Sequence, residues 1–353
     1  MATSQHVGAA VGAHLVGGLK AADAETAMRT TAGVLGRHLR ALTDGETGER
    51  SQWIWWQIGK LTAVDGIAMA GTHGVQESEN PDYAEFPALA IEGSVTELPV
   101  RSLGYADAAE SSYAIFRRLR EEGVVPEGVK FQVSIPTPYA TVAAWVGEED
   151  QQRFFPIYAD AIADEVAEIV RVVGPDDLVI QYDVAVEIGA LTGAMPAAGE
   201  LADKRFVIDA LRDVLARTPG DGERGVHLCY GDYKHRHFTI PGDLSLCVEL
   251  ANAVGDSADF VHMPADRETG RDPGYFEPLR DLSARRLALG VIDYEGDEER
   301  TAELLQAAAT GSGGMEFAVA TECGMARIDE RGPGAPSLER LLELHAKSAA
   351  PIR

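Results

Sequence analysis

Short apolar segments alternate regularly with longer amphipathic segments after Pro126, and this alternation constrains the fold more than any other feature of the sequence. Predicted strands lie at 129–135, 177–182, 225–230, 258–263, 286–292 and 315–320. Predicted helices follow at 152–173, 202–217, 244–254, 276–282, 297–308 and 337–346. Strands that are apolar on both faces are typical of parallel sheets covered by helices. The pattern therefore indicates an α/β fold with a parallel sheet.

Two further strands in the first part of the chain, at 12–18 and near 38–42, bring the total to eight. A predicted helix at 22–36 separates them. Eight strand–helix units in 353 residues predict one (β/α)8 TIM barrel over residues 1–353. A doubly wound open sheet is the alternative, but no Gly-x-Gly-x-x-Gly follows the first strand.

Residues 51–123 form a predicted insertion between the second and third strands. The segment contains Trp53, Trp55 and Trp56, and a predicted helix near 108–121. Two interpretations of the tryptophans stay open. They cover a site at the barrel mouth, or they pack the helix onto the barrel.

Composition excludes several classes of partner. Lys and Arg number 31 against 56 Asp and Glu, a formal charge of −25, which argues against nucleic acid and anionic membranes as partners. The three cysteines form no disulfide framework, and the first 18 residues lack the pattern of a signal peptide. No apolar run approaches the roughly 20 residues that cross a bilayer. We therefore expect a cytoplasmic protein.

Polar residues follow the predicted strands at the end where a barrel places its active site. The set comprises His14, Asp44, Glu46, Thr137, Asp183, His227, Cys229, His262, Asp293 and Cys323. Because the carboxyl ends of all eight strands meet at one mouth, we expect these side chains to converge. The set is rich in residue types that bind metals.

His227 and Cys229 are two residues apart on a predicted strand, so both side chains point to the same face. Imidazole nitrogen and thiolate sulfur are both ligands of zinc. With Cys323 they make three ligands, which suits a zinc ion that keeps one position open. His262 is either a fourth ligand or a hydrogen-bonded barrel histidine. A buried His and an inert Cys are the alternative for the pair alone, and Cys247 fits a core position.

The sequence around these residues resembles the catalytic barrel of cobalamin-independent methionine synthase. That family belongs to a larger group with uroporphyrinogen decarboxylase and the corrinoid-protein methyltransferases. Residues 226–230, Val-His-Leu-Cys-Tyr, are similar to the family's His-Met-Cys-Tyr zinc motif. Residues 320–327 are similar to its Asn-Pro-Asp-Cys-Gly-Leu-Lys-Thr-Arg segment, whose Cys also binds zinc. The resemblance thus implies that His227, Cys229 and Cys323 hold zinc.

The resemblance extends to a binding site for an amino-acid thiol. Asp44-Gly45-Glu46 resembles the family's Gly-Glu, whose Glu holds the homocysteine amino group. Residues 180–183 resemble its Ile-Gln-Ile-Asp, whose Asp contacts the same group. Gly18 stands where the family's first strand has a serine. The match implies that Glu46 and Asp183 bind the substrate and act in catalysis.

Several departures from the family concern the metal and the methyl donor. The family's third zinc ligand is a Glu closing the sixth strand, and Pro264 occupies the equivalent position here. Either His262 substitutes for it, or the metal has three protein ligands. The run after Asp183 lacks the family's Asp-Glu-Pro-Ala. The sequence has no counterpart of the folate-binding half, so we expect a donor other than methyltetrahydrofolate polyglutamate.

The sequence therefore predicts a zinc-dependent methyl or alkyl transferase that acts on a small-molecule thiol. The donor is unidentified, with a methylcorrinoid as one candidate, and a homodimer is a candidate assembly. Asp44, His14, Thr137 and Asp293 are predicted to help bind the substrate. Two alternatives are a metal-independent decarboxylase or lyase on the same barrel, and a relative that has lost catalysis.

Overall fold

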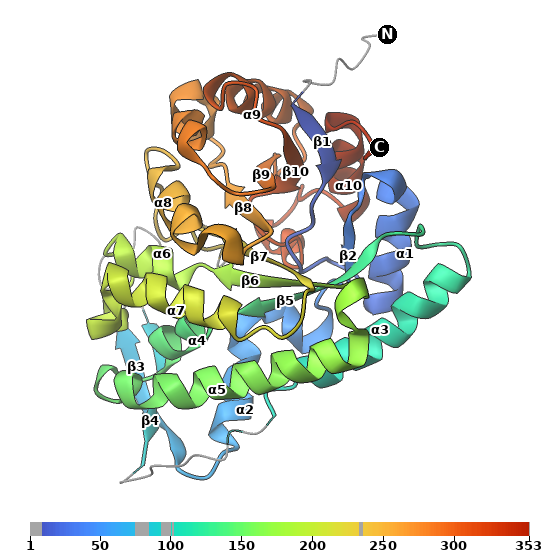
Figure 1. Cartoon of the computed structure of the whole chain (residues 1–353). Coiled ribbons are helices and arrows are strands. Elements are labelled where there is room, and N and C mark those ends of the chain that lie inside the picture. Colours follow the sequence, from blue (N-terminus) through green and yellow to red (C-terminus); the bar gives the residue numbers. More distant parts are fainter. Residues whose placement is uncertain (1–8, 75–84, 93–99, 101, 233–235, 353) are drawn as a thin grey trace.

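The computed structural model describes residues 9–74, 85–92, 100, 102–232 and 236–352. Its main sheet has eight parallel strands in the order β1-β10-β9-β8-β7-β6-β5-β2. The strands are β1 (Ala10–Ala13), β2 (Ala41–Thr43), β5 (Lys130–Pro136), β6 (Leu178–Val184), β7 (Glu223–Leu228), β8 (Phe260–Pro264), β9 (Leu287–Ile292) and β10 (Phe317–Thr321). An isolated parallel bridge between Ala13, the last residue of β1, and Leu39, two residues before β2, links the two edges of this sheet. The predicted α/β barrel fold is confirmed (Figure 1).

All eight predicted strands are present, and the largest difference concerns the first. We expected it at 12–18, whereas β1 ends at Ala13. The pairing of β1 with β10 changes register between Ala10 and Ala13. Gly12 lies at this irregularity with φ +78°, and a Cβ there would come within 2.9 Å of Ile352 Cγ1. The pairing of β1 is therefore irregular around Gly12, one residue before the strand ends.

Long helices surround the sheet where the amphipathic segments predicted them (Figure 1). They are α1 (Ala24–Leu35), α3 (Tyr105–Glu121), α5 (Glu148–Val173), α7 (Lys204–Ala216), α8 (Ser245–Val254), α9 (Glu298–Gly311) and α10 (Leu338–Ser348). The segment after β8 is a 3-10 helix, Pro273–Asp281, in place of the expected α-helix. Its internal Pro278 has no backbone N–H to donate to an α-helical hydrogen bond.

Three short helices were not predicted: α2 (Gln57–Thr62), α4 (Pro138–Trp145) and α6 (Val186–Leu191). All eight residues of α4 are buried. A helix buried on every side has no polar face, so its sequence lacks the amphipathic period. The α4 helix begins directly after β5, with the Thr137 hydroxyl accepting a hydrogen bond from Ala140 N.

The 51–123 segment also contains a two-stranded antiparallel sheet that the sequence did not predict. Its strands are β3 (Ile67–Gly74) and β4 (Glu85–Ile91). The sheet is tied to the start of α5, because Gly147 N donates to Leu89 O and Ile91 N donates to the Asp150 carboxylate. In Figure 1 the two strands lie on the side of the barrel that carries α4 and α5. The insertion therefore packs against the β5–β6 side of the barrel.

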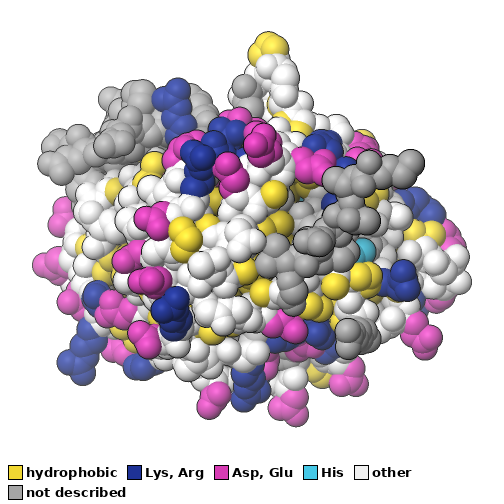
Figure 2. All heavy atoms as spheres, turned by 90° about the horizontal axis from the view of Figure 1, so that it is seen from above, with side chains coloured by type: hydrophobic (Ala, Val, Ile, Leu, Met, Phe, Trp, Pro, Cys, Tyr) yellow, Lys and Arg dark blue, Asp and Glu magenta, His cyan; other side chains and the backbone are white. Residues whose placement is uncertain are grey.

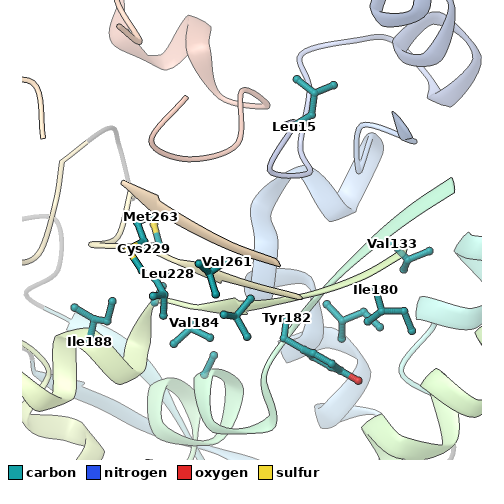
Figure 3. Close-up of a cluster of buried hydrophobic side chains, with 14 of the residues drawn as sticks. Leu15, Val133, Ile180, Tyr182, Val184, Ile188, Leu228, Cys229, Val261 and Met263 are labelled. Atoms are coloured by element: carbon teal, nitrogen blue, oxygen red, sulfur yellow. The ribbon is translucent and has the colours of Figure 1, made fainter. Parts of the chain in front are cut away.

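The core combines barrel side chains with helix side chains. Figure 3 shows part of it, with Val133 of β5, Ile180, Tyr182 and Val184 of β6, and Val261 of β8 among the buried side chains. Charged side chains of both signs cover the outer face seen in Figure 2. Among the helices of the described residues, none combines the length and the apolar composition needed to span a membrane.

Candidate metal centre

Three potential metal ligands converge at the carboxyl ends of β7 and β10. His227 lies on β7, Cys229 follows that strand, and Cys323 follows β10. One nitrogen or sulfur atom from each of the three lies within 4.8 Å of the others. The two sulfur atoms are 3.7 Å apart. The strand ends thus bring together residues that are almost 100 positions apart in sequence.

The spacing of the three side chains suits a tetrahedral zinc ion. Two thiolates at about 2.3 Å from zinc would lie about 3.8 Å apart. The observed sulfur–sulfur distance of 3.7 Å agrees with this value. An imidazole nitrogen on the same ion would lie about 3.6 Å from each sulfur, and a nitrogen of His227 lies within 4.8 Å of both.

The protonation states also bear on metal binding. Burial lowers the pKa of His227 to about 3, so its imidazole is neutral at physiological pH, as a ligand must be. The neighbouring Cys229 thiol and burial raise the pKa of Cys323. Without a cation the Cys323 thiol is therefore protonated at neutral pH. A metal ion at this position would reverse that preference.

His262 lies behind His227, outside the three-residue group. It is fully buried on β8, and its Nδ1 atom is 2.6 Å from His227 Nδ1. Its Nε2 atom is 3.1 Å from the Thr321 carbonyl oxygen. Pro264 closes the same strand and presents its carbonyl oxygen to the Tyr275 hydroxyl at 3.3 Å. The β8 strand therefore has no ligand atom in the group.

A cavity of about 100 Å³ opens over the three side chains. One part is polar and contains Glu46, Asp183, Asp232 and Arg327 beside the cysteines. The other part is lined by apolar and aromatic side chains, namely Trp53, Ile54, Trp55, Phe86, Trp145, Val186, Met195 and Phe238. The predicted covering role of the insertion is thus supported for Trp53 and Trp55. Trp56 instead packs on Tyr105, with ring centroids 5.0 Å apart.

Glu46 and Asp183 face this cavity from the ends of β2 and β6. Glu46 has φ +47°, and its backbone N–H donates to Asp44 Oδ1 at 2.9 Å, which fixes the tight loop after β2. Burial and the nearby Asp183 raise the pKa of Glu46 well above its usual range. Burial raises the pKa of Asp183 to about 7. Two carboxyls that oppose each other's ionisation favour a cation beside them.

Trp53 is a member of the site whose role the sequence did not specify. Its indole Nε1 donates to Asp183 Oδ2 at 3.2 Å, while Gln181 Nε2 donates to Oδ1 at 2.9 Å. The Trp53 backbone has φ +51° and ψ −118°, a conformation that is rare for residues other than glycine. Strained residues of this kind cluster at functional sites. Here the strain accompanies a contact between the insertion and the β6 carboxylate.

Arg327 and Asp232 were also missed as cavity residues. Arg327 donates to the carbonyl oxygens of Ser51 at 3.2 Å and of Asp232 at 3.3 Å. Its guanidinium is also 3.7 Å from the Asp232 carboxylate. Arg327 closes the segment that resembles the second zinc motif, so the sequence contained a signal for it. Asp232 has no comparable signal.

The other predicted substrate-binding residues are not among those that line the cavity. Asp44 bonds to Arg50 and Ser112, each at 2.6 Å, and so supports the loop that holds Glu46. At the start of α4, the Thr137 hydroxyl donates a hydrogen bond to the carboxyl of Glu187, a buried residue of α6. His14 lies inside the barrel, with Nε2 2.8 Å from Gln181 Oε1.

Asp293 likewise lies apart from the metal-ligand group. It accepts a hydrogen bond from Arg267 Nε at 2.7 Å and lines a neighbouring cavity. The substrate-binding role of Asp44, Thr137, His14 and Asp293 therefore stays a prediction, and Glu46 and Asp183 are the predicted carboxylates that face the ligand group.

Known proteins share this fold at low sequence identity. No family model matches the chain, and no curated relative matches its sequence. A B12-independent methionine synthase from Shewanella sp. W3-18-1, solved with selenomethionine, aligns over 92% of this chain and 85% of its own. The TM-score is 0.59 and the identity 15%. A methyltransferase from Methanosarcina mazei aligns over 96% and 93%, with TM-score 0.53 and identity 13%. The resemblance of the sequence to this group of barrels is thus matched in the fold.

Proposed function

We propose that this protein is a zinc-dependent transferase that moves an alkyl group, most simply methyl, to the sulfur of a small thiol. The observation that carries the proposal is the pair of cysteine sulfurs 3.7 Å apart beside His227, in a cavity that is also lined by the carboxyls of Glu46 and Asp183. Three protein ligands leave one position of a tetrahedral ion for the substrate. The fold shared with a methionine synthase and a methyltransferase supports the same reaction class.

His227, Cys229 and Cys323 would hold the zinc. Bound zinc supplies one thing to this chemistry, the deprotonation of a coordinated thiol at neutral pH. A free thiol has a pKa near 8.5, so at pH 7 only a few per cent of it is the nucleophilic thiolate. In the transfer, a sulfur–carbon bond forms and the carbon–donor bond breaks. The donor keeps the electron pair and takes the equivalent of the thiol proton.

Glu46 and Asp183 would orient the thiol substrate. Both face the cavity, and each makes ionisation of the other less favourable. An ammonium group placed between them would relieve this repulsion, so the acceptor is best matched by a thiol that also carries an amino group. Trp53 and Gln181 hold the Asp183 carboxylate in place through two hydrogen bonds.

The apolar part of the cavity would exclude water from the reacting sulfur. Trp55, Phe86 and Trp145 pack with ring centroids 4.6 to 5.7 Å apart and form one wall. An apolar wall that excludes water favours transfer of the alkyl group to sulfur over hydrolysis of the donor. It also offers apolar surface to the part of the donor that carries the alkyl group.

A metal-independent decarboxylase or lyase is less well supported by the cavity. An acidic substrate would require cationic side chains that are available to it. Among the cavity residues that the structure describes, Arg327 is the one Lys or Arg, and its guanidinium contacts Asp232. Glu46 and Asp183 would repel a second anion.

Metal analysis of the purified protein beside three cysteine variants tests the proposal. We expect about one zinc per chain in the wild type and little in Cys229→Ser or Cys323→Ser. Cys247→Ser is the matched control, because Cys247 is buried like Cys229 but lies in α8, outside the cavity. It should retain zinc. A wild type purified without chelator and free of zinc would contradict the proposal.

A further inference from the structure

The buried pair His227 and His262 is arranged so that its hydrogen-bond direction is determined. The rings are 4.6 Å apart between centroids and meet through their Nδ1 atoms at 2.6 Å. The other nitrogen of His262, Nε2, lies 3.1 Å from the backbone oxygen of Thr321. His262 is fully buried, and His227 is 2% exposed.

The Thr321 carbonyl oxygen can only accept a hydrogen bond, so His262 Nε2 must carry a proton. His262 is fully buried, and its two ring nitrogens meet the His227 ring and a backbone oxygen, neither of which is a carboxylate that would stabilise an imidazolium, so this imidazole is neutral and has one ring proton. Its Nδ1 is therefore an acceptor. The proton between the two Nδ1 atoms must then belong to His227. The in-plane lone pair of the His227 ring is therefore on Nε2.

This direction also determines which atoms can bind a metal. An ion cannot lie between two nitrogens 2.6 Å apart, because zinc–nitrogen bonds of about 2.0 Å on one tetrahedral ion separate two nitrogens by more than 3 Å. Nε2 of His227 is the remaining donor atom of that ring. His262 could bind the ion through neither nitrogen without breaking its contact with His227 or with Thr321.

We infer that His262 is a positioning residue. It accepts a hydrogen bond from the Nδ1–H of His227 and so presents the Nε2 lone pair of His227 to the metal. The inference rests on the proposed metal site. Metal-binding histidines usually donate their second N–H to a carboxylate, a backbone carbonyl or a water molecule. Here an imidazole fills that place, and Thr321, at the end of β10 and two residues before Cys323, fixes its proton. One chain of contacts thus links the two strands that supply the ligands.

Co²⁺ titration of the metal-free protein tests this role, because cobalt absorption reports both affinity and thiolate ligation. We expect His262→Leu to bind Co²⁺ roughly 10- to 100-fold more weakly than the wild type. His262→Asn places a carbonyl oxygen near the position of Nδ1 and should recover most of the affinity. His345→Leu is the matched control, since His345 is equally buried but lies in α10. It should bind Co²⁺ as the wild type does.

Equal affinity in the wild type and in His262→Leu would overturn the inference and leave the proposed function intact. A wild type that takes up no Co²⁺ would instead contradict the proposed metal site. Nitrogen-15 NMR of the metal-free wild type provides a test that needs no variant to fold. We expect the ring proton of His227 on Nδ1 and that of His262 on Nε2. A His227 proton on Nε2 would refute the assignment directly.

Discussion

The buried carboxyl of Asp183 should lower the stability of the protein at neutral pH, and its replacement by Asn should raise it. Burial raises the pKa of this group from 3.8 to about 7. Ionisation is therefore less favourable in the folded than in the unfolded protein. The contribution of Asp183 to stability is fully present below pH 3.8 and is lost as the pH rises through about 7. Three pKa units correspond to about 4 kcal/mol.

The amide of Asp183→Asn resembles the protonated carboxyl and does not titrate. The variant should thus be about as stable as the wild type near pH 4 and about 4 kcal/mol more stable near pH 8. With an unfolding entropy of about 2.1 cal/mol/K per residue, 353 residues give a Tm increase of about 5 °C at pH 8. Removing the charge also favours ionisation of Glu46, which acts in the same direction.

Thermal unfolding followed by circular dichroism between pH 4.5 and 8.5 measures this difference. Asp266→Asn is a control of opposite sign. Burial raises the pKa of Asp266, but hydrogen bonds from His237 and Thr269 outweigh it, and the net result is a lowered pKa. That variant should lose stability at neutral pH. The reasoning fails if Asp183→Asn is less stable than the wild type at pH 8, or if the difference does not change with pH.

Two further predictions concern the insertion. Glu165→Ala should lower the free energy of unfolding by about 3 kcal/mol, because the Glu165 carboxylate accepts three backbone N–H groups at the start of α3. The exposed Glu168→Ala is the control and should leave the free energy of unfolding almost unchanged, so equal losses of Tm in the two variants would refute this prediction. Trp53→Phe should raise the pKa of Asp183 further, because it removes a donor to the ionised carboxylate, and a carboxyl carbon-13 titration that matches the wild type would contradict it.

The barrel could be predicted from the sequence because each strand is a short apolar run bounded by turn residues. The same reasoning failed where burial removes the pattern, as in α4, whose eight residues are all buried. It also placed the end of β1 wrongly, where the pairing of β1 with β10 is irregular. The β3–β4 sheet is tied to α5 through contacts distant in the sequence, which no local pattern reports.

The candidate site was predictable where spacing determines geometry. Side chains two residues apart on a strand point to the same face, so the sequence alone predicts that His227 and Cys229 lie side by side. The orientation of the His262 ring could not, because it depends on the Thr321 carbonyl oxygen of another strand. The contact between Trp53 and Asp183 joins residues 130 positions apart. Such contacts follow from the tertiary fold and not from any local motif.

The proposed function requires that the three side chains hold zinc and leave one position for a thiol. Zinc X-ray absorption of the wild-type protein, with and without an amino thiol such as homocysteine, tests it most directly. We predict two sulfur ligands near 2.3 Å and one imidazole nitrogen near 2.0 Å in the protein alone. The thiol should add a third sulfur in place of an oxygen. A spectrum with fewer than two sulfurs, or one that the thiol leaves unchanged, would contradict the account.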